Sequence, residues 1–264
     1  MSAHRYIFVA GLHRSGTSLI ARLLAEHPDI AAITDAPVPE NEGCYLQGAI
    51  PHTARHGVPG HFATDPEQHL VEGSPFDRLE TKLRLQADWA PWFNADKPWR
   101  VEKSPVNLTR MRLLQSLFPL SQFIIATRHP AFTNEAMRKW VDVDAIGFCP
   151  YWQAAHDIVL ADIEYLHGAM IVRYEDLVEQ PERIRRAMFA FLDLPLCDTA
   201  QPVTNGNLKY CDAAQRSGVC YPGLGYAPGA SHGPLQIPVR HPLRAIRERV
   251  EGVLSGNSLA DQTG

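Results

Sequence analysis

The sequence predicts an α/β fold in which helices flank both faces of a parallel sheet. Three observations support this class. Short apolar runs rich in β-branched and aromatic residues recur along the chain, and segments with helical spacing of apolar residues separate them. These separations have the length of a crossover helix, the connection that parallel strands require. The 264 residues, of which 45% are hydrophobic and 20% charged, suffice for one such domain with a sizeable core.

The elements of the N-terminal half follow from these patterns in order. Arg5–Ala10 is a β-branched and aromatic run that ends at Gly11, which predicts a buried strand. Thr17–His27 has its leucines and isoleucine at helical spacing, and Pro28 ends the predicted helix. The next predicted elements are a helix over Leu79–Phe93, a strand over Trp99–Lys103 and a helix over about Asn107–Phe118.

The C-terminal half continues the alternation. Gln122–Thr127 is the clearest strand pattern of the sequence, and Pro130, a residue suited to a first helical turn, begins a helix to about Trp140. The remaining predicted elements are a helix over about Pro150–His167, a strand over Ala169–Arg173, a helix over Pro181–Leu192 and a last helix over about Leu243–Leu254. Strand and helix thus alternate over most of the chain.

Proline and glycine mark two irregular regions. The chain has 21 Pro and 18 Gly, and they concentrate in Pro37–Pro75 and Pro222–Pro242. Long irregular segments on a regular scaffold often bind ligands. No internal repeat or linker divides the chain, so we expect one domain over residues 1–264, with a core over about 5–193 and a loop-rich C-terminal segment with the last helix over about 195–254.

Charge and cysteine content exclude several classes. The net charge of −4 disfavours a general nucleic-acid binder, which relies on a surplus of Lys and Arg. No apolar stretch is long enough for a membrane span, and the first eleven residues show no cleavage-site pattern of a secretory signal. The five cysteines are odd in number and contain no Cys-x-x-Cys pair. We therefore expect a cytoplasmic protein without a disulfide framework or a zinc site.

The segment after the first strand has the pattern of an anion-binding loop. Gly11–Ser18 reads G-x-x-x-x-G-T-S, which is close to the phosphate-binding loop G-x-x-x-x-G-K-[ST] and likewise precedes a helix. Glycines let the backbone approach an anion, and a helix N-terminus favours negative charge. Thr17 replaces the usual lysine, which weakens a nucleotide triphosphatase interpretation, and Arg14 supplies a cation instead. The alternative is a glycine-containing turn without a ligand.

Arg14, Ser15, Gly16, Thr17 and Ser18 resemble the 5′-phosphosulfate loop of the sulfotransferases that use 3′-phosphoadenosine 5′-phosphosulfate. The chain is most similar to the branch that includes bacterial and carbohydrate enzymes and the tyrosylprotein sulfotransferases. The resemblance implies a P-loop-type, sulfotransferase-like sheet. It also implies that these five residues bind the donor, with adenosine 3′,5′-bisphosphate as product.

Two further segments carry the resemblance, which covers roughly residues 5–193. Arg128 stands where the family has the arginine that binds the 3′-phosphate, but Ala136 replaces the serine that usually completes this site, for which Thr133 or Asn134 could substitute. Tyr174, within Arg-Tyr-Glu-Asp-Leu, matches a tyrosine that lies near the adenine. Without the resemblance, Arg128 reads as a solvated residue at a strand end, and the acidic pair after Tyr174 reads as a helix start.

Sulfuryl transfer needs cations at the leaving phosphate and a base for the acceptor hydroxyl. Arg14 is one cation, and Lys103 resembles the lysine of the tyrosylprotein branch, although an ordinary surface lysine is the alternative. For the base, Asp35 occupies the position of that branch's glutamate. The competing residues are Glu40, Glu42 and His52, and we rank Asp35 and Glu42 ahead of His52. Within Asn205–Pro238, Lys209 and Arg216 could help cover the nucleotide, although an ordinary surface loop is the favoured interpretation of that segment.

The sequence therefore predicts a cytosolic sulfotransferase that acts on a hydroxyl of a small-molecule or glycan acceptor without a metal. A glycan, a lipid or natural product, and a peptide tyrosine all fit as acceptors. Two competing functions remain: a P-loop kinase of a small metabolite, and a non-catalytic nucleotide-binding protein of the same fold.

Overall fold

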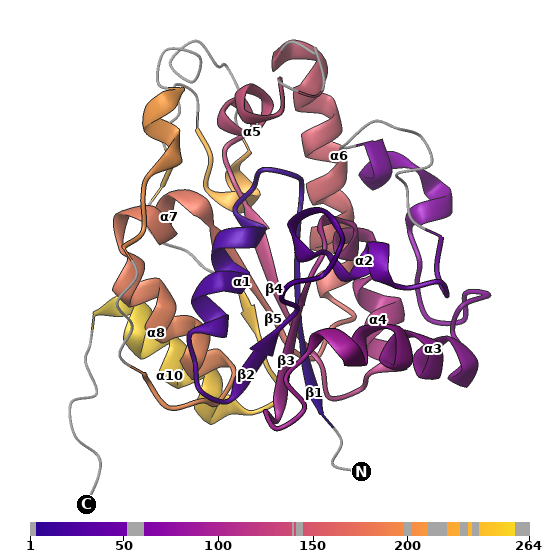
Figure 1. Ribbon diagram of the computed structural model, residues 1–264. Helices are drawn as coiled ribbons and strands as arrows, with labels where there is room; N and C mark the ends of the chain where they lie inside the picture. The colour runs from indigo at the N-terminus through magenta and orange to yellow at the C-terminus, as the bar shows by residue number, and fades with distance from the viewer. Residues whose placement is uncertain are drawn as a thin grey trace, which may run out of the picture.

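The fold is organised around a six-stranded mixed sheet. The computed structural model describes residues 4–51, 61–138, 140, 145–197, 202–210, 221–227, 232–233 and 238–256. The strands are β1 (Arg5–Gly11), β2 (Ile30–Ala32), β3 (Trp99–Lys103), β4 (Gln122–Thr127), β5 (Ala169–Arg173) and β6 (Val239–Arg240). Their order is β2-β3-β1-β4-β5-β6, with only β6 antiparallel to its neighbour (Figure 1).

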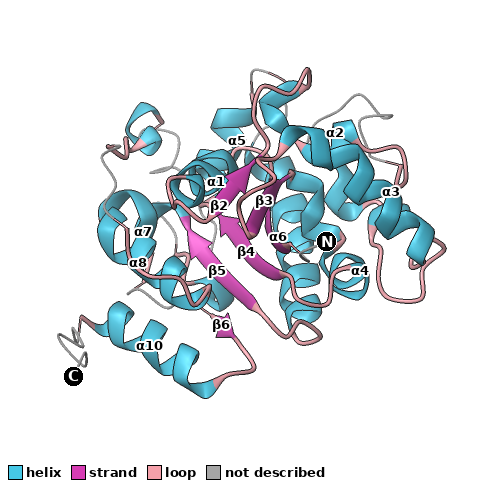
Figure 2. Cartoon of the chain, turned by 60° about the horizontal axis from the view of Figure 1, so that its bottom comes forward, coloured by secondary structure: helices cyan, strands magenta, loops and turns pink. Residues whose placement is uncertain are grey.

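Helices cover both faces of this sheet. They are α1 (Thr17–Ala25), α2 (Gly43–Leu46), α3 (Leu79–Trp89), α4 (Met111–Leu117), α5 (Pro130–Met137), α6 (Ala145–Ile163), α7 (Tyr174–Glu179), α8 (Pro181–Phe191) and α10 (Arg244–Ser255). In Figure 2, α1, α7, α8 and α10 lie on one side of the strands, and α3, α4 and α6 on the other. The predicted α/β class, with helices flanking both faces, is confirmed.

The side chains of β1 alternate between the two faces of the sheet, and this explains why the molecule has an apolar core on each face. Tyr6 and Phe8 point to one face, where they pack with residues of α3, α4 and α6. Ile7 and Val9 point to the other face, where they pack with residues of α1, α8 and α10. All four side chains are almost fully buried. A strand buried on both faces is apolar at every position, and this is why β1 reads as a continuous apolar run.

The strand register brings the chemically interesting residues to one edge. In the parallel ladder, Val9 of β1 lies opposite Lys103 of β3, and Gly11 of β1 lies opposite Ala126 of β4. Thr127 of β4 lies opposite Arg173 of β5. The segments that leave the carboxyl ends of β1, β3, β4 and β5 therefore meet at one edge, where ligands of open α/β sheets bind.

Four strands predicted from the sequence, β1, β3, β4 and β5, are confirmed. Two other strands were not predicted because they are too short to show a pattern: β2 has three residues and β6 has two. The helix α7 was also missed. Its six residues begin directly after β5, so the segment read as a junction rather than as a separate helix.

Several helix ends were predicted wrongly. The helix predicted over about Pro150–His167 runs from Ala145 to Ile163 as α6, so Pro150 lies inside it. The segment expected to be helical from Asn107 starts as a 3-10 turn over Pro105–Thr109, and α4 begins only at Met111. The helix α5 ends at Met137 instead of Trp140.

Cys44 and Cys149 are free thiols, and Cys211 and Cys220 lie outside the described residues. Among the helices that the structure describes, none has the length and apolar character needed to cross a bilayer.

The fully buried His156 on α6 makes the stability of the fold depend on pH. Its Nδ1 lies 2.7 Å from the carbonyl oxygen of Trp152, so Nδ1 carries the proton, and its Nε2 lies 3.0 Å from the hydroxyl of Thr127. Burial lowers the pKa of His156 to about 4. Between this pKa and the unfolded value of about 6.5, the unfolded chain binds more protons than the folded one.

We therefore expect the free energy of unfolding to fall as the pH drops from about 6.5 to about 4, with His156 contributing up to about 1.4 kcal/mol per pH unit. Urea unfolding of His156→Gln across this range should give a shallower pH dependence. The exposed His167→Gln serves as control and should leave the slope unchanged. Equal slopes for His156→Gln and the wild type would contradict this account.

Candidate functional site

The loop between β1 and α1 needs glycine at two positions. A Cβ on Gly11 would lie 2.5 Å from Ser15 Oγ and 2.7 Å from the carbonyl oxygen of Ala126. Gly16 has a φ of 107°, and a Cβ there would lie 2.8 Å from the ring of Tyr174. The first glycine lets the loop cross β4 closely, and the second lets Tyr174 approach the start of α1.

The loop wraps the N-terminus of α1 beside a cavity. Ser15 closes the turn, since its backbone N–H and its hydroxyl both donate to the carbonyl of Leu12, at 3.1 and 2.7 Å. Thr17 and Ser18 form the first turn of α1, whose exposed N–H groups favour an anion. Arg14, at a φ of 66°, carries an exposed side chain whose guanidinium carbon lies 5.4 Å from the ring centre of Trp140.

The cavity has a volume of about 470 Å³ and lies at the carboxyl edge of the sheet. Its walls come from seven regions of the chain: the loop with the start of α1, the segment around α2, the turns that follow β3 and β4, the residue Trp140 beyond α5, the start of α7, and the segment after residue 202. The lining residues are His13, Arg14, Gly16, Thr17, Ser18, Leu19, Pro39, Glu40, Glu42, Tyr45, Pro105, Arg128, Trp140, Tyr174, Gly206, Lys209 and Tyr210.

Arg128, directly after β4, joins two walls of this cavity. Its side chain is buried, its Nε donates to Asn207 Oδ1 at 2.8 Å, and one Nη donates to the carbonyl of Arg14 at 2.9 Å. Its other Nη is buried without a hydrogen-bond partner among the described residues. The sequence alternative of a solvated strand-end arginine is thus wrong, because Arg128 is only 5% exposed.

Tyr174 stacks its ring against this arginine. The guanidinium carbon of Arg128 lies 4.6 Å from the ring centre of Tyr174. The phenol oxygen accepts from the backbone N–H of Gly206 at 2.8 Å and donates to the carbonyl of Thr204. Tyr174 therefore links the start of α7 to the segment 202–210 and leaves its ring at the cavity wall.

Lys103 and Glu42 form a buried ion pair. Lys103 Nζ lies 3.0 Å from Glu42 Oε1, and the two side chains are 6% and 9% exposed. Lys103 is therefore not an ordinary surface lysine. Burial raises the pKa of Glu42, and the neighbouring Lys103 ammonium opposes this shift only in part. A carboxyl group with a raised pKa beside a cavity is suited to proton transfer.

Glu102, the neighbour of Lys103, holds Glu42 in place from behind. Its carboxylate is fully buried and accepts from Ser104 Oγ at 2.5 Å, Asn107 Nδ2 at 2.6 Å and the backbone N–H of Gly43 at 3.0 Å. Gly43 directly follows Glu42, so this contact fixes α2 against the end of β3. Burial raises the pKa of the Glu102 carboxyl, and these donors oppose the shift.

The other candidate bases differ in where they lie relative to the cavity. Glu40 lines the cavity, is exposed, and its Oε2 accepts from Ser18 Oγ at 3.3 Å. Asp35 is exposed in the preceding turn, at a φ of 54°, and is not among the lining residues. His52 lies outside the described residues, as does Arg216.

The substitutes suggested for the missing serine also lie apart from the cavity. Thr133 donates its hydroxyl to backbone carbonyls of Arg128 and His129. Asn134 is 2% exposed and is not among the lining residues. Ala136 is likewise buried. The partner that the structure gives to Arg128 is instead Asn207, 79 residues further along the chain.

His13 and Asn207 are site residues that the sequence patterns did not indicate. His13 occupies a variable position of the loop, yet it lines the cavity, and burial together with Lys103 lowers its pKa to about 4. Asn207 belongs to a 3-10 turn over Gly206–Lys209 that begins at a capping Asn205. An Asn-Gly-Asn run marks such a turn, but nothing local in it points to a buried arginine.

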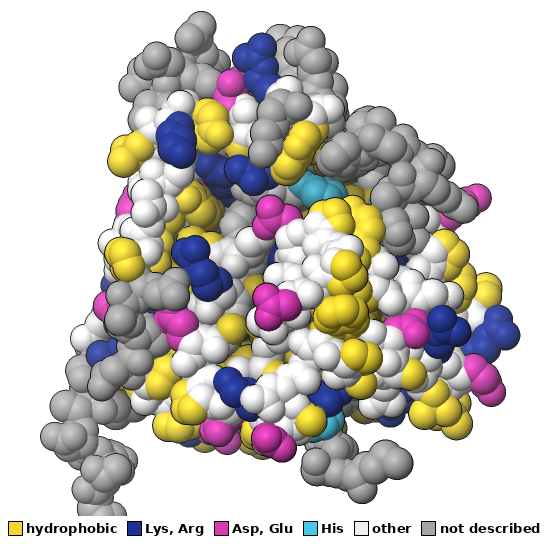
Figure 3. Space-filling view, viewed as in Figure 1, with side chains coloured by type: hydrophobic (Ala, Val, Ile, Leu, Met, Phe, Trp, Pro, Cys, Tyr) yellow, Lys and Arg dark blue, Asp and Glu magenta, His cyan; other side chains and the backbone are white. Residues whose placement is uncertain are grey.

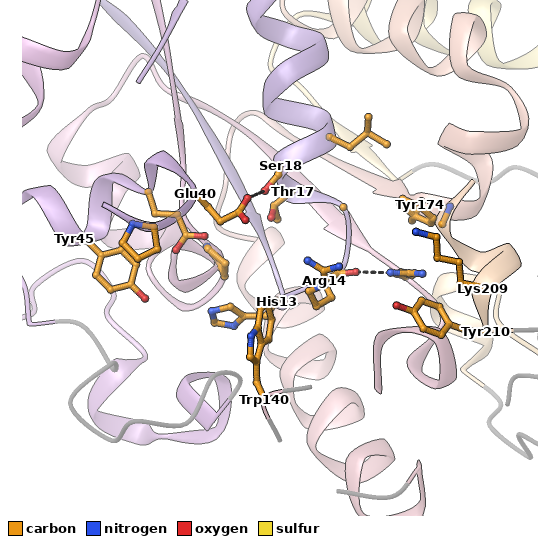
Figure 4. A pocket seen from close by; sticks show the side chains of 17 residues that line it. His13, Arg14, Thr17, Ser18, Glu40, Tyr45, Trp140, Tyr174, Lys209 and Tyr210 are labelled. Atoms are coloured by element: carbon orange, nitrogen blue, oxygen red, sulfur yellow. Dashed lines mark hydrogen bonds between the residues drawn. The ribbon is translucent and has the colours of Figure 1, made fainter. Parts of the chain in front are cut away.

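Charges are unevenly distributed over the cavity. In Figure 4, Tyr174, Lys209 and Tyr210 lie on one side, Glu40 and Tyr45 on the other, and His13 and Arg14 between them. Figure 3 shows the same face hollowed where Lys and Arg side chains gather, with a His and acidic side chains beside them. Among the described residues, no group of three or more His, Cys, Asp or Glu is placed to hold a metal ion.

A model of the Sulfotransferase family matches residues 6–198. An uncharacterized protein of Aquifex aeolicus (strain VF5) is 24% identical over 226 residues, which are 78% of this chain and 28% of that protein. The chain thus spans little more than a quarter of the length of this curated relative.

Solved structures with a similar fold include three sulfotransferases. The sulfotransferase domain from the curacin biosynthetic pathway is 20% identical, covers 75% of this chain and 76% of its own, and has a TM-score of 0.44. The sulfotransferase from Alicyclobacillus acidocaldarius is 17% identical, with 78% and 89% coverage and a TM-score of 0.47. Sulfotransferase STF1 from Mycobacterium tuberculosis H37Rv is 18% identical, with 75% and 70% coverage and a TM-score of 0.47.

The close approach of α2 to Glu102 can be tested at Gly43. A Cβ on Gly43 would lie 2.6 Å from Glu102 Oε1, and that carboxylate is held by Ser104 and Asn107. We expect Gly43→Ala to destabilise the protein by about 1–3 kcal/mol in thermal or urea unfolding. Gly48→Ala is the matched control, because the nearest atom to its Cβ would be at the exposed end of Arg84, 3.2 Å away. Equal stability of the two variants would refute the proposed constraint.

Proposed function

Because the chain belongs to the sulfotransferase family, we propose that it transfers a sulfuryl group from 3′-phosphoadenosine 5′-phosphosulfate to a hydroxyl of a small-molecule or glycan acceptor. The observation that carries this proposal is the presence of two anion-binding groups on one cavity. The loop and the N-terminus of α1 form the first, and the buried Arg128 with its unpartnered Nη forms the second. A nucleotide with phosphate groups at both the 3′ and 5′ positions requires such a pair.

The donor occupies the cavity in one orientation. Arg14, Ser15, Gly16, Thr17 and Ser18 surround the 5′-phosphosulfate, with the α1 N-terminus directed at it. Arg128 binds the 3′-phosphate. Tyr174, whose ring already stacks on Arg128 at 4.6 Å, contacts the adenine. Asn134, which is 2% exposed and whose Nδ2 has no hydrogen-bond partner among the described residues, remains a second candidate for the 3′-phosphate.

In the proposed reaction, the acceptor oxygen attacks sulfur while the bond from sulfur to the bridging phosphate oxygen breaks. The acceptor proton passes to a carboxylate, and adenosine 3′,5′-bisphosphate leaves with the electron pair of the broken bond. Arg14, which lines the cavity, and Lys103, which stands behind the lining residues in its ion pair with Glu42, stabilise the charge that develops on the leaving phosphate. The chemistry resembles phosphoryl transfer, in which positioning and electrostatics do most of the work.

Glu42 is the residue that we assign as general base. It lines the cavity, it is held by the neighbouring backbone contact with Glu102, and burial raises its pKa toward the range in which a carboxylate accepts a proton effectively. Glu40 also lines the cavity, but its carboxylate contacts the hydroxyl of Ser18. Asp35 stands outside the lining residues, so we rank it below both.

The proposed function is tested by giving the purified protein ³⁵S-labelled donor together with a cell extract. We expect labelled organic sulfate that mass spectrometry can identify, together with release of adenosine 3′,5′-bisphosphate. Mg-ATP should not serve as a donor, because Thr17 occupies the position of the lysine that kinases of this loop type use. Phosphorylated product from Mg-ATP, or donor that binds without any transfer, would favour the kinase or the non-catalytic function instead.

The Lys103–Glu42 ion pair predicts how kcat depends on pH. Glu42 accepts a proton only when it is ionised, so kcat should rise with pH through its raised pKa. The Lys103 ammonium opposes the increase in the pKa of Glu42, so removing it should raise that pKa further. We therefore expect Lys103→Ala to lower kcat about 100-fold or more and to move the acid limb of the pH profile to higher pH.

In the same assay Glu42→Gln should lose the acid limb along with most of its activity, while its affinity for adenosine 3′,5′-bisphosphate stays close to that of the wild type. Glu40→Gln is the matched control and should keep the limb. A pH profile that is unchanged in both Lys103→Ala and Glu42→Gln would remove the pair from the mechanism.

A further inference from the structure

Arg128 is held by neutral groups although a carboxylate lies close by. Its Nε donates to the Asn207 amide oxygen at 2.8 Å, and one Nη donates to a backbone carbonyl. Beyond the amide, Glu175 Oε1 accepts from Asn207 Nδ2 at 3.2 Å. The three residues therefore form a series in which a neutral amide separates a guanidinium from a carboxylate, and all three are at most 6% exposed.

The chemistry of the partners fixes which way the amide faces. A guanidinium only donates hydrogen bonds and an ionised carboxylate only accepts them. Asn207 must therefore direct its oxygen to Arg128 and its NH₂ group to Glu175. Glu175 is itself fixed, because it also accepts from the backbone N–H of His129 and from the hydroxyl of Tyr226, each at 3.1 Å.

We propose that Asn207 is the positioning residue of the 3′-phosphate site, which holds the Arg128 guanidinium in place and keeps it from pairing with Glu175. This inference rests on the proposed function, since it concerns the 3′-phosphate of the donor. An arginine paired with a carboxylate would have to break that pair before it could bind a phosphate. Through the amide, Arg128 is oriented while its charge and its unpartnered Nη stay available to the ligand.

The position of Asn207 explains how the site manages without a serine at position 136. The segment that bears Asn207 also contributes Gly206, Lys209 and Tyr210 to the cavity wall, and Tyr174 binds the backbone of Gly206. Arg128 and Tyr174 thus both hold this segment at the cavity wall. It positions Arg128 from a part of the chain far beyond α5, where Ala136 lies.

The inference is tested by the preference for a 3′-phosphate, measured calorimetrically as the Kd of adenosine 5′-monophosphate divided by the Kd of adenosine 3′,5′-bisphosphate. We expect the wild type to prefer the bisphosphate and Asn207→Ala to reduce this preference about 10-fold, the size expected for one charge-assisted hydrogen bond. Asn205→Ala is the matched control. Asn205 Oδ1 accepts from the backbone N–H of Asn207, whereas the side chain that accepts from Arg128 is that of Asn207, so the preference should persist.

A double variant distinguishes the proposed role of Asn207 in keeping the two charges apart from a packing effect of its side chain. If Asn207 keeps Glu175 away from Arg128, then Glu175→Gln combined with Asn207→Ala should restore part of the preference that Asn207→Ala loses. Equal weakening of both nucleotides in Asn207→Ala, or no restoration in the double variant, would overturn the inference. A wild type without preference for the bisphosphate would instead overturn the proposed donor. Asn207→Leu, which keeps the volume, gives the same readout if the alanine variant does not fold.

Discussion

Two buried cations at the carboxyl edge of the sheet are compensated in different ways, and the organisation of the site depends on this difference. Lys103 has a carboxylate partner in Glu42, whereas Arg128 has an amide and a carbonyl. A buried charge without compensation is costly, so neither arrangement is incidental. The ion pair keeps a carboxyl group beside the cavity, and the neutral cradle leaves a guanidinium with spare hydrogen-bonding capacity.

Both arrangements depend on buried carboxylates that do not line the cavity themselves. Glu102 binds the backbone N–H next to Glu42, and Glu175 binds the amide that holds Arg128. Each of them also receives hydrogen bonds from two further groups, which fixes its position. Glu42 and Arg128, which line the cavity, are thus each supported by a carboxylate behind the wall, Glu102 near the end of β3 and Glu175 in the first turn of α7. The strand register aligns these ends across the sheet.

The sequence predicted the parts of the fold and site that are encoded locally. The strands β1, β3, β4 and β5 are continuous apolar runs, and the loop from Gly11 to Ser18 has the spacing of an anion site, so both could be recognised. The start of α6 was predicted wrongly because Pro150, a residue type suited to a helix start, lies within this helix. The contact between Arg128 and Asn207 spans 79 residues, and no periodic pattern records a contact of that kind.

The separation of charge within the cavity matches the direction in which charge moves in the proposed reaction. Negative charge grows on the leaving phosphate, and the cations Arg14, Arg128 and Lys209 line the cavity near the loop and the segment 202–210. The acceptor hydroxyl loses a proton, and Glu42 lines the cavity together with Glu40 and Tyr45. Glu40 and Tyr45 lie on the side opposite Lys209 in Figure 4. His13 lies between the two sides, and its pKa of about 4 keeps it uncharged near neutral pH. The His13 ring therefore adds no positive charge between the two sides of the cavity at neutral pH.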